Sequence, residues 1–403
     1  MSSRESIITN YTDFFAAGCK EPGELKYGIE AEHIITYNNT GKAVPYLGDD
    51  GVCSLLHELK KYFTETDMTD GHLIGLLNDE ANISLEPGSQ LEISITASES
   101  IPEISRIYQK YHKIISDILT ERKQEINTVG YQPASLVRDI VILPKCRYYF
   151  MDQHFGRSGG SGINMMRGTA SCQVILDYTD EKDFINKYRC ASVLTPLLAL
   201  ISTNTPIFEG APNHNLLIRT KIWRDVDPAR CGIPPETFNP DFSFAKYAEY
   251  IINQAAIFEI KDEKSTGSDK KVSEILADKP DWDDDYLLYL SLAFPDVRLR
   301  QYIEIRVADS MDAVKMFAYM ALIKGLFLDM PCLNKWLSKF PFSIDSIINA
   351  QDAIMKEGMN ALVNEEPVAD LLNQMIKLSL ANLDKEESEI LLSGFGQYLY
   401  NII

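Results

Sequence analysis

The residues of this 403-residue chain that could carry chemistry are glutamates set inside otherwise apolar, β-branched segments. In a β-strand, side chains two residues apart share a face, so Glu30 and Glu32 are expected to point the same way. An ionised carboxylate buried on a sheet face is costly unless it is paired or bound to a metal ion. The pattern therefore raises the question of a cation site. The glutamates concerned are Glu30, Glu32, Glu86, Glu92 and Glu304.

An arginine accompanies the last of these glutamates. In RQYIEIRVA, residues 300–308, a strand would place Tyr302, Glu304 and Arg306 on one face and apolar side chains on the other. Ordinary explanations exist too. An E-x-E pair is typical of the solvated face of an antiparallel sheet, and Glu304 with Arg306 suits a cross-strand ion pair. Spacing alone leaves both interpretations open.

Amide synthesis from a carboxylic acid would use such a set of residues. A carboxylate is a poor electrophile and is commonly activated with ATP as an acyl phosphate, which requires two anions to meet. Magnesium ions held by glutamate oxygens screen the phosphates, and arginines neutralise the transferring phosphoryl group or grip a carboxylate. One sheet face with several glutamates and converging arginines would meet both requirements.

Several segments have the features of the strands and helices that would position these residues. Strands are expected at 27–37, on both sides of Pro87-Gly88 within 81–96, and at 139–143, 172–178 and 300–308. Helices are expected at 2–17, 52–64, 101–125, 184–202 and repeatedly after residue 311. Segment 241–259 mixes both signals and stays open, and the polar residues 261–271 predict a surface loop or lid.

Few β-α-β spacings are regular, so the sequence predicts an α+β fold with an antiparallel or mixed sheet rather than a doubly wound one. Residues 1–310 are expected to form the catalytic region, and residues 311–403 an all-helical C-terminal region packed on it as one compact unit.

Composition narrows the partners. The formal charge is −19 and the pI about 4.8, which disfavours nucleic acid and anionic membrane surfaces. Seven cysteines, an odd number without a CxxC spacing, favour reduced thiols. The longest apolar stretch, around residues 313–328, is interrupted by lysines and predicts a buried helix rather than a membrane span.

Six segments in order resemble the plant and proteobacterial type of glutamate–cysteine ligase. The resemblance covers residues 25–330, and LEPGSQLEIS and IW-x-D-x-D-x-x-R are its most specific parts. It implies a glutamine synthetase-like catalytic fold, a curved and mostly antiparallel sheet whose concave face holds magnesium, ATP and glutamate. The segments are YGIEAEHIIT (27–36), SLEPGSQLEIS (84–94), NMMRGTASCQVILDY (164–178), NTPIFEG (204–210), RTKIWRDVDPARCGIP (219–234) and FPDVRLRQYIEIRVAD (294–309).

The resemblance also implies roles for individual residues. Arg306, Glu304 and Arg230 become candidate catalytic residues. Two or more magnesium ions are expected, with ATP as co-substrate. The candidate magnesium ligands are Glu30, Glu32, Glu86, Glu92 and Glu304, and the candidate substrate-binding residues are Arg219, Arg230, Arg167, Gln173 and Trp223.

One position departs from the family pattern. An arginine precedes the Thr-Cys-Thr run of the plant type, whereas this chain has Gly168 there and Arg167 one residue earlier. Either Arg167 serves instead or the pocket differs, which bears on the amine acceptor. The expected reaction joins the γ-carboxylate of glutamate to the amine of cysteine in glutathione biosynthesis. The alternatives are another amine acceptor or a non-catalytic homologue.

The remaining expectations concern location and assembly. Residues 1–15 lack the apolar core of a signal peptide, and no transit peptide of the plant forms is recognised. A cytoplasmic enzyme of the bacterial type, acting on small molecules as a monomer or homodimer, is therefore expected.

Overall fold

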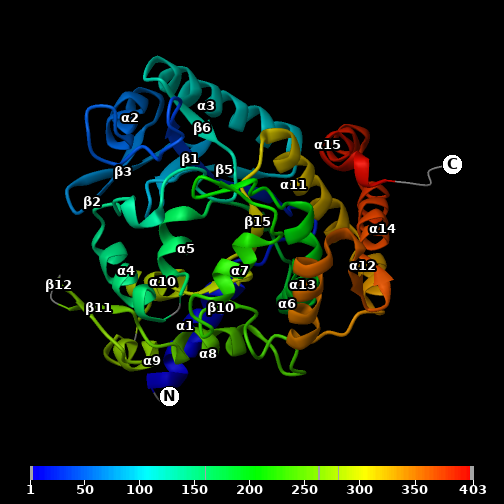
Figure 1. Ribbon diagram of the computed structural model, residues 1–403. Coiled ribbons are helices and arrows are strands. Elements are labelled where there is room, and N and C mark those ends of the chain that lie inside the picture. The colour runs from blue at the N-terminus through cyan, green and yellow to red at the C-terminus, as the bar shows by residue number, and fades with distance from the viewer. Residues whose placement is uncertain (1–2, 159, 262–263, 280, 400–403) are drawn as a thin grey trace.

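The chain is described by a computed structural model for residues 3–158, 160–261, 264–279 and 281–399 (Figure 1). In this part of the chain a nine-stranded sheet forms, in the order β14-β15-β7-β1-β5-β4-β3-β2, with β6 also paired to β1. All pairings within this sheet are antiparallel. The strands are β1 (Tyr27–Tyr37), β2 (Glu65–Thr69), β3 (His72–Leu77), β4 (Ala81–Leu85), β5 (Leu91–Ser98), β6 (Gln124–Asn127), β7 (Ser171–Leu176), β14 (Val297–Leu299) and β15 (Ile303–Asp309).

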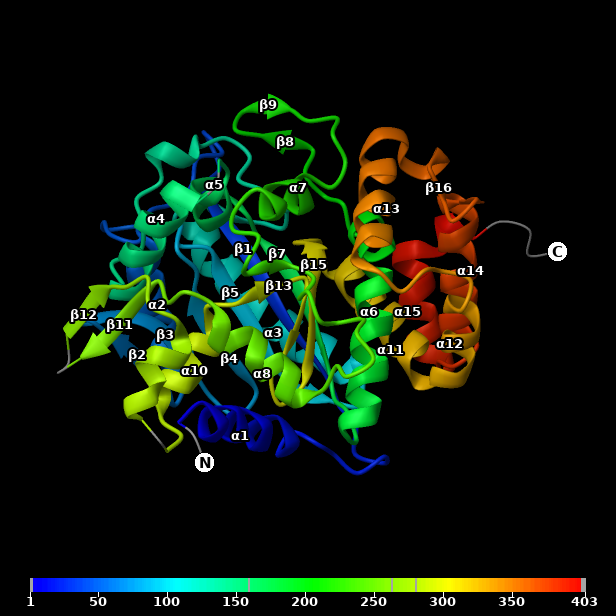
Figure 2. The same ribbon diagram turned by 90° about the horizontal axis from the view of Figure 1, so that it is seen from below.

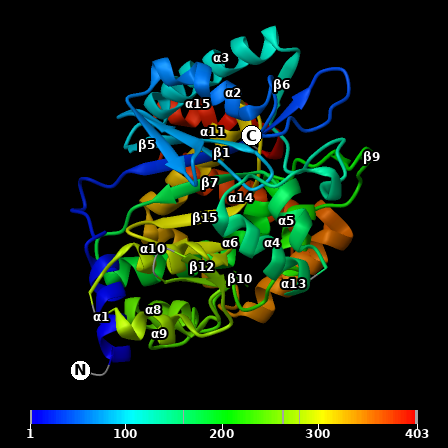
Figure 3. The ribbon, with the colours of Figure 1, turned by 90° about the vertical axis from the view of Figure 1, so that its left-hand side faces the viewer.

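Helices cover both faces of the sheet, as Figure 3 shows. One face is packed by α2 (Val52–Leu59), α3 (Ile101–Glu121), α6 (Glu181–Ile201) and α11 (Ala313–Leu328). Over the other face lie α4 (Cys146–Ser158), α5 (Gly162–Gly168) and α7 (Ile218–Arg224). The helix α8 (Phe244–Asn253) flanks the β14 edge, where the Tyr247 hydroxyl accepts a hydrogen bond from the Leu299 backbone at 3.1 Å.

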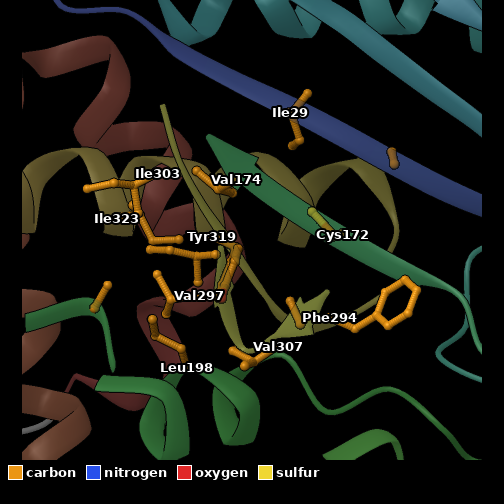
Figure 4. Close-up of a cluster of buried hydrophobic side chains, with 14 of the residues drawn as sticks. Ile29, Cys172, Val174, Leu198, Phe294, Val297, Ile303, Val307, Tyr319 and Ile323 are labelled. Carbon is orange, nitrogen blue, oxygen red and sulfur yellow. The ribbon is translucent and has the colours of Figure 1, made fainter. Parts of the chain in front are cut away.

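The alternation of side chains along the central strands separates an apolar face from a polar one. Ile29, Val174 and Ile303 project from β1, β7 and β15 toward the face that α11 covers with Tyr319 and Ile323 (Figure 4). All five side chains are fully buried. The intervening residues of the same strands, Glu30 and Gln173 among them, therefore face the opposite side.

The C-terminal region is a group of helices beside the sheet (Figure 2). Lys324 of α11 forms an ion pair with Glu387 of α15 at 2.6 Å, and Glu387 also accepts a hydrogen bond from the Ile101 amide at the start of α3 at 3.3 Å. No single helix in the described ranges has the length and apolar character to cross a membrane, and only α11 and α12 together, bent by 93°, reach those criteria. The helices after α11 are α12 (Met330–Leu337), α13 (Ile344–Glu357), α14 (Val368–Leu380) and α15 (Lys385–Phe395).

Smaller elements complete the fold. The helices α1 (Ser3–Ala16), α9 (Val272–Ile275) and α10 (Asp284–Ser291) lie near α8 and the β14 edge (Figure 2). A parallel pair joins β10 (Cys231–Gly232) to β13 (Phe294–Pro295). The two-stranded hairpins are β8 (Ile207–Phe208) with β9 (Ala211–Pro212), β11 (Phe258–Lys261) with β12 (Lys264–Gly267), and β16 (Leu362–Val363) with β17 (Glu366–Pro367).

The predicted α+β class with a mostly antiparallel sheet is confirmed, and β1 has the predicted bounds. Three element predictions need correction. The strand expected at 139–143 is a short 3-10 turn followed by irregular chain. The helical tail contains the β16–β17 hairpin. The loop expected at 261–271 includes β12, and its residues 262–263 lie outside the described ranges. The open segment 241–259 contains α8 and the start of β11.

Candidate active site

A cavity of about 430 Å³ opens on the polar face of the sheet. Its floor comes from the central strands and the β4–β5 turn, and α4, α5, α7 and the β14–β15 hairpin supply its walls. The side chains that line it include Glu30, Glu32, Asn82, Glu86, Gln90, Glu92, Ser94, Arg147, Tyr148, Met151, Met165, Met166, Thr169, Gln173, Arg219, Trp223, Ser291, Phe294, Arg298, Arg300, Tyr302 and Arg306.

Strand register brings four of the five predicted glutamates to this cavity. Glu32 of β1 stands directly opposite Glu92 of β5, and Glu30 is one step along the same face. Glu86 follows β4 in a turn closed by the Glu86 amide and the Gln90 carbonyl at 2.9 Å. The Gln90 side chain ties this turn to the start of β7 by donating to the Thr169 carbonyl at 2.9 Å. Carboxylates 54 to 62 positions apart in the sequence thereby share one wall.

Desolvation and mutual repulsion make three of these carboxylates, Glu30, Glu86 and Glu92, hard to ionise. Burial, then the neighbouring Glu304 and Glu92, raises the pKa of Glu30 well above its ordinary value. Burial, then Glu32, raises the pKa of Glu86 to about 7. Burial, then Glu86 and Glu32, raises the pKa of Glu92 to about 8. A cation among them would relieve this repulsion.

The donor chemistry suits a hard divalent cation. All four groups offer carboxylate oxygens, which magnesium prefers. Within the described ranges, Glu30 and Glu86 receive no side-chain hydrogen bond, and both hydroxyl groups that contact Glu92 use the same oxygen, Oε1. In the same ranges no three acidic, histidine or cysteine side chains are already arranged around one metal position. Holding an ion would therefore require the glutamate side chains to turn inward.

Five arginines also line the cavity. Arg298 and Arg300 come from the β14 end, Arg306 from β15, Arg219 from α7 and Arg147 from α4. Among the residues that the structure describes, the Nε atoms of Arg147, Arg219 and Arg300 and the Nε1 atom of Trp223 are buried and have no hydrogen-bond partner. Unsatisfied buried donors of this kind are unusual and suit anionic ligands.

Glu304, predicted as a magnesium ligand and catalytic residue, does not line the cavity. Its side chain is fully buried and receives Arg298 Nε at 2.5 Å and Nη2 at 3.1 Å. Arg306 Nη1 lies 3.3 Å from the same carboxylate. Although burial alone would raise the pKa of Glu304, Arg298 and then Arg306 hold it well below the usual range. We conclude that Glu304 anchors two arginines from behind, and the prediction of a ligand role is corrected accordingly.

Arg219 and Trp223 occupy one side of α7 and face the cavity together. Arg219 Nη1 donates to the Arg306 carbonyl at 2.6 Å, and its guanidinium carbon lies 5.4 Å from the centre of the Trp223 ring. The helix follows Leu217, whose φ of 52° is strained for a bulky side chain. This strained entry sets the direction in which α7 presents Arg219.

Arg230 lies away from the cavity. Its side chain is 2% exposed, and Nε donates to Asp227 at 3.0 Å while Nη1 donates to Gln254 at 3.2 Å. It also donates to the Ala255 carbonyl. With its donors used by the surrounding loops, Arg230 is a structural residue here, and its predicted catalytic and substrate-binding roles are corrected.

Arg167 also turns away from the cavity. Its guanidinium donates to Asp152 at 2.6 Å and to the Ile140 carbonyl at 3.0 Å. Arg167 and Gly168 form the end of the helix α5, which precedes β7. Gly168 contacts the Tyr131 ring so closely that a Cβ atom would lie 2.6 Å from it. Neither position 167 nor position 168 thus supplies a cation to the cavity.

Sequence reasoning missed three arginines of the lining. Arg298 and Arg300 alternate with Leu299 ahead of Tyr302, so the R-x-R-x-Y-x-E-x-R pattern of one face was present in the sequence. Arg147 reaches the cavity because α4 packs over the sheet. No local pattern in residues 146–158 predicts that position.

A solved structure shares this architecture. The glutamate–cysteine ligase of Francisella tularensis in complex with AMP matches with a TM-score of 0.52 at 13% identity, covering 93% of this chain and 82% of that one. At that identity the likeness concerns the fold.

Sequence relatives are found among plant enzymes. The chloroplastic glutamate–cysteine ligase of Solanum lycopersicum is 28% identical over 386 residues, covering 92% of this chain and 72% of that protein. The Arabidopsis thaliana enzyme is 30% identical over 342 residues, covering 81% of this chain and 63% of its own length. The cytoplasmic location expected from the sequence is contradicted here, because these relatives are chloroplastic enzymes.

The model of glutamate–cysteine ligase family 2 matches residues 26–357, which include every strand of the main sheet and all the residues that line the cavity. The match covers most of the chain, and it agrees with the resemblance noted in the six segments. The chain therefore belongs to the glutamate–cysteine ligase family, a family of carboxylate–amine ligases.

Proposed function

We propose that this protein activates the γ-carboxylate of glutamate with ATP and joins it to the amine of cysteine, giving γ-glutamylcysteine, ADP and phosphate. The observation that carries the proposal is the cavity that holds half-buried, mutually repelling glutamates together with arginines that have unused donors. Such a site favours ligands that bring cations and anions together, as a magnesium–nucleotide complex does.

The proposed division of roles follows the geometry. Glu30, Glu86 and Glu92, with Glu32, would hold magnesium. When bound, magnesium would screen the phosphates of ATP and the attacking carboxylate from each other. Glu30 and Glu86 receive no side-chain hydrogen bond within the described ranges, and Glu92 keeps Oε2 free of one, so these carboxylates keep lone pairs for a cation, unlike Glu304.

The arginines would act on the transferring phosphoryl group. Arg306 and Arg298 share Glu304 as a common anchor, which fixes their guanidinium groups while leaving other N–H donors toward the cavity. Arginine donors that are positioned before the reaction stabilise the charge that develops in the transition state. Arg219 Nε and Trp223 Nε1 would bind the α-carboxylate of glutamate and so orient its γ-carboxylate.

Cleavage of the ATP γ-phosphoryl bond and attack by the γ-carboxylate oxygen give γ-glutamyl phosphate and ADP. The amine nitrogen then forms the amide bond as phosphate leaves, and a proton is lost from the nitrogen. Met151, Met165 and Met166 line part of the cavity and offer polarisable contacts for a thiol side chain.

A second candidate keeps this chemistry but uses another amine. It is motivated by Arg167 and Gly168, neither of which presents a cation where the plant-type pattern has an arginine. The expected state of monomer or homodimer stays a prediction.

The decisive experiment measures ADP release with glutamate and a panel of amines, and identifies the product by mass spectrometry. We expect release that requires glutamate, magnesium and cysteine together, with loss of activity in Arg219→Gln. Arg157→Gln, which alters an exposed arginine at the end of α4, serves as the control. Preference for an amine without a thiol would select the second candidate, and no amine-dependent turnover would contradict both.

A further inference from the structure

Gln173 lines the cavity, yet its amide is already fully engaged inside the protein. Nε2 donates to Glu32 Oε1 at 3.0 Å and to Ser171 Oγ at 3.2 Å. Oε1 accepts a hydrogen bond from Arg306 Nη1. The side chain is 3% exposed. Both N–H donors of Gln173 are therefore used, and donation to a substrate, one form of the contact first expected for Gln173, would require one of these bonds to break.

The backbone around Gln173 is arranged for this bridge. Strand β7 lies between β1 and β15, and Gln173 pairs with Glu30 on its β1 side. On the β15 side the register shifts between Ile305 and Ala308, so the chain bulges where Arg306 emerges. Bulges beside active sites commonly re-aim a side chain. Here the bulge directs the Arg306 guanidinium onto the Gln173 carbonyl oxygen.

An amide is the group that this position requires. Glu32 and Arg306 come from strands that are two positions apart, roughly 10 Å between backbones, so a bridging side chain on β7 can reach both. The amide donates to the carboxylate and accepts from the guanidinium, and it leaves the charge of each intact. A direct ion pair would instead satisfy each group with the other and reduce its attraction for a ligand.

The same bonds limit what Glu32 can still bind. A carboxylate has about four lone-pair positions. Oε1 of Glu32 accepts from Gln173 and from Ser171 Oγ at 2.7 Å, and Oε2 accepts from the Ser171 amide at 2.7 Å. One position on Oε2 is left, and its direction is set by the three bonds already made.

We propose that Gln173 is a positioning residue that couples the cation-binding glutamates to the phosphate-binding arginine, aiming Glu32 and Arg306 at the two partners of one metal–nucleotide complex. The inference rests on the proposed function. It assigns Gln173 no contact with glutamate or with the amine acceptor.

Three variants test the proposal. Gln173→Met keeps the length and removes all three hydrogen bonds, Gln173→Glu keeps the acceptor and replaces the donor with a negative charge, and Gln124→Leu is the matched control. Gln124 is 2% exposed on β6, beside β1, and its amide donates to the Asp50 carbonyl outside the cavity. Manganese binding, followed by electron paramagnetic resonance with and without a non-hydrolysable ATP analogue, gives a readout that does not need turnover.

We expect both Gln173 variants to bind manganese with the analogue about 10- to 100-fold more weakly, as is typical when the partner of a metal ligand is lost. We expect kcat to fall as well, with the KM for glutamate and for the amine changed less than about twofold. Gln124→Leu should lower the melting temperature without weakening manganese binding.

Other outcomes would overturn the proposal. Unchanged manganese binding with a raised KM for glutamate would make Gln173 a substrate contact. If manganese binding were weakened equally in Gln124→Leu, the effect would reflect a general loss of stability and not the position of Gln173. If Gln173→Met does not fold, the near-isosteric Gln173→Glu decides, and parental manganese affinity in that variant refutes the coupling. Failure of the parent to release ADP with glutamate and cysteine would instead refute the proposed function, while the manganese comparison still reports on Gln173.

Discussion

Glu30 and Glu304 lie on the same sheet but in opposite electrostatic surroundings. Glu304 receives two hydrogen bonds from Arg298 and lies 3.3 Å from Arg306. Glu30 receives none from a side chain in the described ranges, and burial and its acidic neighbours raise its pKa. Two glutamates of the same sheet thus have different physical roles. Glu304 neutralises the charge of arginines, whereas Glu30 has no cationic hydrogen-bond partner among the described residues and is available to a metal ion.

The first prediction compares Glu304→Gln with Glu30→Gln. Removing the Glu304 charge leaves buried guanidinium groups uncompensated, so the free energy of unfolding should fall by about 3–5 kcal/mol. Removing the Glu30 charge relieves repulsion, so stability in EDTA should be kept or increased while ADP release falls by at least about 100-fold. Urea unfolding and turnover assays measure both effects. Equal destabilisation by the two substitutions would contradict this division.

The second prediction concerns pH in the absence of metal. The pKa values of Glu86 and Glu92 rise from 4.5 to about 7 and about 8 in the folded protein. The folded state therefore holds these protons more tightly than the unfolded chain. Its stability is highest at low pH with respect to these groups and is lost as the pH rises from about 4.5 through about 8, by on the order of a few kcal/mol.

Calorimetry in EDTA at pH 6 and pH 8 checks this, and the glutamate variants below separate the contribution of the site from that of the histidines, which also titrate in this range. We expect a lower melting temperature at pH 8, and a larger increase on adding magnesium at pH 8 than at pH 6, because magnesium binds the ionised carboxylates. Glu92→Gln should reduce the pH dependence, whereas Glu80→Gln, at an exposed pair with Lys110, should leave it unchanged. A flat profile in EDTA would count against the proposed cation site.

At this scale the sequence predicts residue types better than residue orientation. The period of two places Glu30 and Glu32 correctly on one face, and the turn at Pro87-Gly88 brings Glu86 to it. Arg230 and Arg167 belong to segments that resemble family motifs, but their guanidinium groups donate hydrogen bonds to nearby carboxylates and carbonyls instead of facing the cavity. No local pattern contains that information, because the partners depend on how loops fold back.

Among the elements, the helices of the C-terminal region pack at unusually short separations where glycines replace side chains. Gly325 of α11 meets α14 so closely that a Cβ atom would lie 2.2 Å from Ser379 Oγ and 2.4 Å from the Ser379 carbonyl oxygen. The neighbouring atoms include backbone, which cannot simply rotate aside. Helix propensity and packing therefore oppose each other at this position.

The third prediction uses that opposition. Gly325→Ala should lower the free energy of unfolding by about 1–3 kcal/mol through overpacking, although alanine is the better helix former. Gly156→Ala is the matched control, since Gly156 lies in α4 with no atom within 4 Å of an added Cβ. That variant should gain about 0.5–1 kcal/mol. Urea titration measures the free energy of unfolding of both variants. An unchanged value for Gly325→Ala would contradict the prediction and show that α11 and α14 can move apart to accommodate the added methyl group.

Elements with a strong period were predictable and those set by tertiary contacts were not. Strand β1 is rich in β-branched residues and lies between turn-forming segments, and its bounds match the prediction. Residues 139–143 have strand-forming side chains, but Ile140 supplies its carbonyl to Arg167 instead of to a neighbouring strand. Partner availability, not propensity, decides that segment.

For the whole molecule, the C-terminal helices complete the core rather than form an attachment. Helix α11 is buried along nearly all of its length and covers the face of the sheet opposite the cavity. Tyr319 and Ile323 pack there against the sheet, and Lys324 bonds to the carbonyl before α3. We therefore infer that residues 1–310 and 311–403 fold as one cooperative unit.

The fourth prediction follows from that inference. Calorimetric and van't Hoff enthalpies of unfolding should agree, and ADP formation and the helical signal should be lost together on heating. Removal of residues 311–403 should yield aggregated protein, because the apolar side of β1, β7 and β15 loses its cover. Two separate transitions, or a soluble 1–310 fragment that binds nucleotide, would contradict cooperative folding.

The tight fit of Gly168 against Tyr131 has an evolutionary consequence. The ring stacks on Phe208 with centroids 4.1 Å apart, and its hydroxyl donates to Glu209 at 3.1 Å. A lineage acquiring Gly168→Arg first would therefore insert a long side chain into an occupied space and lose fold stability before gaining any recognition. Exchange of Tyr131 for a small residue has to come earlier or at the same time, so ancestral intermediates should show the two changes in that order or as a pair.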